Sequence, residues 1–110
     1  MFEFLKRILP QPMKTVSTSD LEGLLSAGKI TLLDVRSPQE YHRGHIRQAR
    51  NLPLDQIGTY HGPKGEAVYV ICQSGMRSKR ASQQLRKMGY DAINVKGGMA
   101  AYQGKTIGGK

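Results

Sequence analysis

The sequence predicts a single α/β domain built on a mainly parallel sheet. Short segments of strand-like composition alternate along the chain with segments of helical periodicity, which is typical of this fold class. The length of 110 residues and the hydrophobic content of 38% suit one such domain. A chain of this length buries about two-thirds of the surface that it exposes when unfolded, so we expect it to fold alone.

Five segments have the composition of strands. One of them, residues 67–71, has no charged side chain and is predicted to be the central buried strand. The expected strands are residues 15–17, 30–35, 49–54, 67–71 and 92–95.

Helices are predicted between these strands. Ser19 and Asp20 are expected to cap the first helix, and Pro38 suits the first turn of the second. Ala81 and Leu85 share one face of the third, which Gly89 should end. The helices are expected before Gly28, from Ser37–Pro38 through His42, over residues 78–88 and over residues 99–102, with a loop at 58–65 and a turn at Gly97–Gly98.

The two ends of the chain are expected to differ from the domain between them. Residues 1–13 are predicted to be an amphipathic arm, which packs on the domain or touches a membrane surface or a partner. Charged residues and prolines interrupt it too early for a signal peptide, and no apolar run approaches the ~20 residues of a membrane span. Residues 14–103 form the predicted domain, and residues 104–110 are expected to be a flexible tail.

The charge is strongly positive, with 17 basic and 8 acidic side chains and a net charge of +9. Nucleic-acid binding is not expected, because the basic groups are not interleaved with aromatic residues and no RNA-binding motif is present. A positive surface around a cleft more simply steers small anions towards it.

Cys72 is the single cysteine of the chain and the first candidate catalytic residue. It follows the predicted central strand and precedes a loop and a helix, so backbone N–H groups and the positive end of the helix should favour its thiolate. Packing as a small hydrophobic residue is the alternative, but the polar and flexible neighbours fit it poorly. An internal disulfide is excluded, and a working thiol suggests the reducing cytoplasm.

Three segments of the sequence resemble a single-domain rhodanese, a sulfurtransferase. The resemblance covers roughly residues 15–102, and Tyr102 stands where the family commonly has tryptophan. Four residues separate Cys72 from Arg77, whereas related phosphatases have five. The segments are 33–46 with Ala49, Asn51 and Pro53; 70–78 with Ala81, Leu85, Gly89 and Tyr90; and 95–99 with Tyr102.

The resemblance implies a rhodanese-like fold, with a sheet of about five strands flanked by helices on both faces. It implies transfer of sulfane sulfur from thiosulfate or a low-molecular-weight persulfide to cyanide or a thiol, through a persulfide on Cys72. A persulfide carrier or sulfur-sensing module that serves a protein partner is the alternative, because it would need the same loop. No cofactor and no metal are expected, and the donor, the acceptor and the oligomeric state stay open.

The loop after Cys72 is expected to stabilise the anion and bind the substrate. Its backbone N–H groups can face the sulfur, and Gly75 lets it curl. Arg77 should hold an anionic donor, with a salt bridge that fixes the loop as the alternative. Ser78 can cap the helix or donate to sulfur, and capping is favoured. The predicted loop residues are Gln73, Ser74, Gly75, Met76, Arg77 and Ser78.

Asp34 and Arg36 are expected to line the pocket, as the resemblance implies. For Arg36, substrate contact and a structural ion pair are equally supported, whereas a structural role is favoured for Asp34. Glu40 and His45 are expected to be structural rather than catalytic.

Overall fold

The computed structural model describes residues 13–109, and within them it contains a parallel five-stranded sheet. The strand order is β1-β5-β4-β2-β3, and each neighbouring pair is parallel. This arrangement confirms the predicted fold class. The strands are β1 (Lys14–Val16), β2 (Thr31–Asp34), β3 (Arg50–Asn51), β4 (Ala67–Ile71) and β5 (Asp91–Val95).

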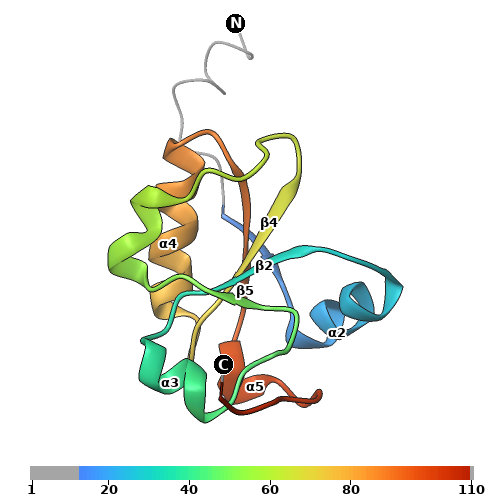
Figure 1. Cartoon of the computed structure of the whole chain (residues 1–110). Helices are drawn as coiled ribbons and strands as arrows, with labels where there is room; N and C mark the ends of the chain where they lie inside the picture. Colours follow the sequence, from blue (N-terminus) through green and yellow to red (C-terminus); the bar gives the residue numbers. More distant parts are fainter. Residues whose placement is uncertain (1–12, 110) are drawn as a thin grey trace, which may run out of the picture.

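Helices cover both faces of the sheet. Figure 1 shows α4 with the 3₁₀ helix η1 on one side of the strands and α2 on the other. A loop is expected from the sequence at residues 58–65, and nothing in the sequence indicates η1, whose one buried residue is Ile57. The helices are α2 (Thr18–Ala27), α3 (Pro38–Arg43), η1 (Leu54–Thr59), α4 (Met76–Lys87) and α5 (Gly98–Ala101).

The core has two layers because successive strand residues point to opposite faces of the sheet. In β4, Val68 and Val70 join the layer under α4, whereas Ile71 joins the layer under α2. Leu85 of α4 and Leu21 of α2 are fully buried in these two layers. The strands are thereby held from both sides, which fixes the position of the loops at their carboxyl ends.

The helix boundaries differ from the predicted ones where a cap was misjudged. Ser17, not Ser19 or Asp20, caps α2, and its Oγ accepts from Asp20 N at 2.9 Å. Helix α4 begins at Met76, two residues before the expected start. At its other end Gly89 has a φ of +98°, and Tyr90 N donates to Leu85 O at 3.0 Å, as expected for a glycine-terminated helix.

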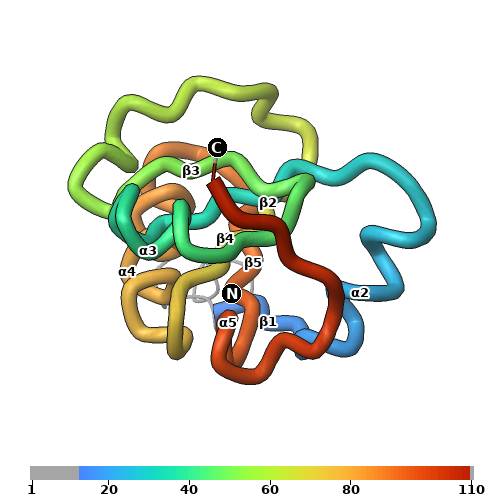
Figure 2. The backbone as a smooth tube through the Cα atoms, turned by 60° about the horizontal axis from the view of Figure 1, so that its bottom comes forward, coloured from blue at the N-terminus to red at the C-terminus, as the bar shows by residue number. Residues whose placement is uncertain are grey.

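The segment after α5 runs back across the domain and forms backbone hydrogen bonds with it. Ile107 pairs with His45 in an antiparallel bridge through two 2.8 Å hydrogen bonds, and Gly109 N donates to His42 O at 2.7 Å. Figure 2 shows this C-terminal segment passing beside α3. The flexible tail expected at 104–110 stays a prediction, and within it Ile107 and Gly109 have backbone partners on the domain.

The predicted N-terminal arm lies almost wholly outside the described residues, which begin at Met13. Among the residues that the structure describes, no helix has both the length and the apolar character needed to cross a membrane.

Candidate active site

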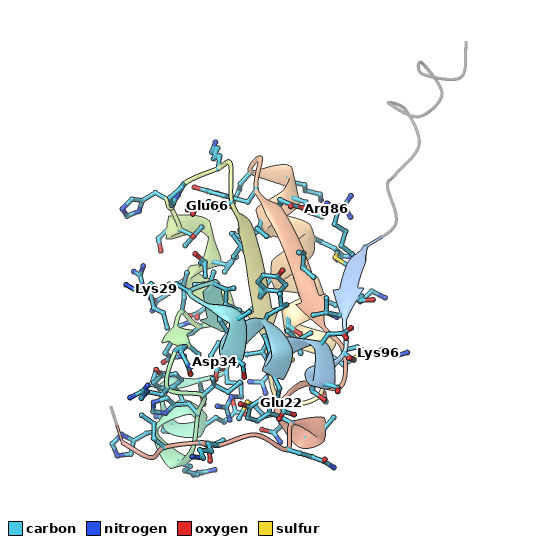
Figure 3. All side chains as sticks on the ribbon, turned by 90° about the vertical axis from the view of Figure 1, so that its right-hand side faces the viewer. Glu22, Lys29, Asp34, Glu66, Arg86 and Lys96 are labelled. Atoms are coloured by element: carbon cyan, nitrogen blue, oxygen red, sulfur yellow. The ribbon has the colours of Figure 1, made fainter. Side chains whose placement is uncertain are left out.

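The predicted site residues meet at the carboxyl end of the sheet. Asp34 is the last residue of β2, and Cys72 directly follows β4. These two strands are neighbours, with Asp34 opposite Ile71, so both loops leave the sheet side by side. Figure 3 shows Asp34 at this end of the sheet, near the C-terminal segment.

The Cys72 sulfur is buried and surrounded by hydrogen-bond donors. Gly75 N donates to Sγ at 3.0 Å, and Ser78 Oγ lies 3.3 Å from Sγ. Burial alone raises the pKa of the Cys72 thiol. Hydrogen bonds from the Ser78 hydroxyl and from the backbone N–H groups of Ser78, Gly75 and Ser74 outweigh burial and leave that pKa below its ordinary value. The thiolate is therefore favoured at this position.

Ser78 lies close to the sulfur because α4 begins at Met76, which places Ser78 in the first turn of the helix. The N-cap is Gly75, so Ser78 lies within the first turn with its side chain fully buried. Capping, which the sequence favoured for Ser78, is wrong, and the hydroxyl faces Cys72 instead. The apolar spacing of α4 starts at Ala81 and gave no signal for these extra residues at its start.

Helix α5 supports the Cys72 loop through backbone hydrogen bonds. Met99 N donates to Cys72 O at 2.8 Å, and Ala100 N donates to Gln73 O at 2.9 Å. Gly98 has a φ of +59°, and a Cβ at this position would collide with the Cys72 carbonyl oxygen. Glycine is therefore required for this close approach. The sequence predicts a turn at Gly97–Gly98 but gives no sign of this supporting role.

Arg77 forms a two-pronged ion pair with Glu40 of α3. Its Nη1 and Nη2 donate to Oε1 and Oε2 at 2.6 and 2.8 Å. These hydrogen bonds are the main reason why the pKa of Glu40 falls from 4.5 to about 2, against the opposing effect of burial. Glu40 also accepts from Ser37 N and completes a capping box with Ser37. The ion pair that was the alternative interpretation of Arg77 is thus present.

Arg36 forms a second pair, with Asp34. Its Nε and Nη2 donate to Oδ1 and Oδ2 at 2.9 and 2.7 Å. The two residues are 3% and 0% exposed, so this pair is buried. Nη2 also donates to Gly44 O at 2.8 Å, which ties β2 to the end of α3. Asp34 is thus held in a buried ion pair, and its structural role stays the prediction made from the sequence.

The remaining nitrogen of Arg36 faces the loop. Its Nη1 lies 3.4 Å from Gln73 Oε1, longer than the usual 2.7–3.2 Å for such a bond. Gln73 and Ser74 are exposed, and Met76 is 72% exposed beside them. The sequence therefore predicted the start of the loop after Cys72, but it extended the loop into the first turn of α4 and did not separate the sulfur-facing residues from the solvent-facing ones.

His45 takes part in structural contacts. Its ring is buried, stacks on Tyr41 with 3.7 Å between ring centroids, and has Nδ1 2.7 Å from Tyr41 O. These contacts agree with the structural role expected for it. Within residues 13–109, no group of three or more histidine, cysteine, aspartate or glutamate side chains is placed to hold a metal ion.

The fold and the loop define an α/β domain with a cysteine at the junction of a strand and a helix. Residues 17–105 match the rhodanese-like domain family. An uncharacterized protein of Bacillus subtilis (strain 168), YqhL, is 41% identical over 96 residues, which cover 84% of this chain and 75% of that protein. The chain therefore belongs to the rhodanese-like domain family, which is of the sulfurtransferase type.

Solved structures agree with this assignment. A rhodanese-like domain protein from Staphylococcus aureus is 32% identical with a TM-score of 0.79, and the match covers 89% of this chain and 100% of that one. The reduced CoADR-RHD protein of Bacillus anthracis is 34% identical with a TM-score of 0.74, and the match covers 82% of this chain but 16% of that one. The same domain thus occurs both as a small protein and as a minor part of a longer chain.

Proposed function

We propose that this protein is a sulfurtransferase that moves sulfane sulfur from thiosulfate or a low-molecular-weight persulfide through Cys72. The observation that carries the proposal is the environment of the sulfur, which receives a hydrogen bond from Gly75 N and lies beside the Ser78 hydroxyl. Donors held in this way stabilise a negative sulfur without reorganising during the reaction. They stabilise the Cys72 thiolate, which is the nucleophile of the first displacement below and the leaving group of the second.

The reaction consists of two displacements. The Cys72 thiolate attacks the outer sulfur of the donor, whose S–S or S–sulfonate bond breaks and whose leaving group, a thiolate or sulfite, takes the electron pair. An acceptor thiolate or cyanide then attacks the terminal sulfur of the Cys72 persulfide, and Cys72 leaves as a thiolate. No electron acceptor outside these reactants is needed.

Intact-mass spectrometry tests the first displacement directly. We expect wild-type protein mixed with a persulfide donor or thiosulfate to gain one sulfur atom, and cyanide to remove it as thiocyanate. Cys72→Ser protein should gain none while its circular dichroism spectrum stays that of the wild type. Sulfur gained equally by folded Cys72→Ser protein would contradict the assignment of Cys72. An aryl phosphate serves as the control substrate, because a four-residue loop should not accommodate a phosphate.

A protein acceptor is the second candidate, in which the domain acts as a persulfide carrier. Met76 supports it, because a large apolar side chain that is 72% exposed at the rim of the loop offers a contact for a partner. Met76→Ser should slow transfer to a protein acceptor and leave transfer to cyanide unchanged. If Met76→Ser changed neither the rate with the protein acceptor nor the rate with cyanide, the free enzyme would be favoured over the carrier.

A further inference from the structure

A cavity of about 460 Å³ lies beside the Cys72 loop. Gln73 and Met99 line it, and both adjoin Cys72, the first in sequence and the second through the hydrogen bond from Met99 N to Cys72 O. Its size falls in the range of about 300–1,000 Å³ that is usual for small-molecule sites. The lining also includes Arg36, Arg43, Gly44 and Thr106, from the ends of β2 and α3 and from the C-terminal segment.

The cavity has an excess of unpaired positive charge. Arg43 is exposed, and its side chain has no ion-pair partner among residues 13–109. Arg36 is neutralised by Asp34 along one edge, but Nη1 on its other edge has the single long contact to Gln73. Glu40 also lines the cavity, and both of its carboxylate oxygens are bound by Arg77.

Arg77 is poorly placed to receive an anion because both its Nη atoms already bind Glu40. A donor at Arg77 would have to displace a bidentate carboxylate, whereas a donor at Arg36 and Arg43 has to displace one 3.4 Å contact. An anion therefore displaces fewer and weaker contacts in the cavity than at Arg77.

We propose that this cavity binds an oxyanion, a carboxylate or a phosphate, on the organic part of a low-molecular-weight persulfide whose outer sulfur goes to Cys72. Arg36 Nη1 and the Arg43 guanidinium hold the oxyanion, in a cavity whose lining includes Gln73, the residue that follows Cys72. Thiosulfate carries its oxyanion directly on the transferred sulfur and has no organic part, so we expect it to depend less on the cavity. The inference rests on the proposed sulfur transfer and names the donor class for it.

Matched donors test the selectivity. The donors are the persulfides of 3-mercaptopropionate, 2-mercaptoethyl phosphate and the uncharged 3-mercaptopropanamide, with thiosulfate as a fourth. Arg43→Gln should lower the rate of Cys72 persulfide formation about tenfold with at least one of the two anionic persulfides, since a charge-assisted hydrogen bond contributes about 1.5 kcal/mol or more. The amide and thiosulfate should change less than twofold. Which anionic persulfide is affected more identifies the preferred oxyanion.

Arg47→Gln is the control, because Arg47 is an exposed arginine four residues further on that lines a different cavity. It removes the same charge and should leave all four donors within twofold. If Arg43→Gln and Arg47→Gln give the same loss, or if Arg43→Gln slows the amide as much as the anions, the cavity does not select the donor.

A binding measurement tests anion binding in the cavity independently of sulfur transfer. Wild-type protein is titrated with 3-(methylthio)propionate and with S-methyl-2-mercaptoethyl phosphate, which cannot transfer sulfur, and backbone amide NMR shifts are followed. Saturable shifts at Gly44, Gln73 and Thr106 with one of them, lost in Arg43→Gln, would support the cavity even if no donor formed a Cys72 persulfide. Without such shifts, or with shifts that Arg43→Gln leaves unchanged, the inference fails although sulfur transfer itself can still hold.

Discussion

Two arginine–carboxylate pairs flank the Cys72 loop, and they differ in burial. Arg36 and Asp34 have side chains that are 4% and 0% exposed, whereas Arg77 and Glu40 are 38% and 28% exposed. Both pairs are short and two-pronged. Water screens the outer pair and reaches the inner pair poorly, so similar geometry should have different energetic consequences.

The difference in burial indicates that the two pairs have different roles. The inner pair ties β2 to the backbone of Gly44, and Asn51 Nδ2 donates to Asp34 O and Arg36 O across the same corner. The outer pair joins α3 to the first turn of α4. The inner pair therefore supports the fold beneath the site, and the outer pair closes the gap between the two elements that border the loop.

Asp34→Asn should have the largest effect on stability. The amide keeps the shape of the carboxylate but leaves the buried guanidinium of Arg36 without its counter-charge, which typically costs about 3–5 kcal/mol. Urea unfolding followed by circular dichroism measures the loss. Glu40→Gln makes the same chemical change in the outer pair, and an equal loss in both variants would remove the distinction between them.

Arg77→Ala should reduce sulfur transfer about tenfold with charged and uncharged donors alike. The reason is that the loop loses its link to α3 and is positioned less well. A tenfold loss of rate corresponds to about 1.4 kcal/mol of activation free energy. Arg77→Lys should recover little, since one ammonium cannot replace the two-pronged contact. If the charged donors alone were slowed, Arg77 would bind the donor after all, and the role assigned to Arg36 and Arg43 would be wrong.

The sequence predicted the sheet well because its signals are local. An uncharged five-residue run identified β4, and Ser37 followed by Pro38 identified the start of α3. The pairing of Arg77 with Glu40 spans 37 residues, and the contact of Ile107 with His45 spans 62, so neither leaves a local pattern. The position of Ser78 was misjudged for a related reason, because a loop glycine, Gly75, took the N-cap position that a serine usually fills.

The pKa of the Cys72 thiol distinguishes the contribution of the loop from that of the two ion pairs. Ser78→Ala should raise the pKa of Cys72, because the Ser78 hydroxyl is the strongest of the groups that lower it. The rate of iodoacetamide alkylation against pH measures this change. Arg77→Ala is the comparison, and a larger rise in that variant would mean that the outer pair, not the loop, controls the thiolate.

The smallest effect is expected for Glu40→Gln, and it should depend on pH. The pKa of Glu40 in the folded protein, about 2, lies below its ordinary value of 4.5, so the carboxylate is the form that folding favours. Its contribution is therefore complete above about pH 4.5 and is lost as the pH falls towards 2. Because the pair is partly exposed, we expect this contribution to be about 1 kcal/mol. Urea unfolding of wild type and variant at constant ionic strength should show that difference at pH 6, and a smaller one at pH 3. A difference that stays constant over this range would mean that Glu40 acts through its capping contacts with Ser37, which an amide oxygen can retain only in part, and not through its charge.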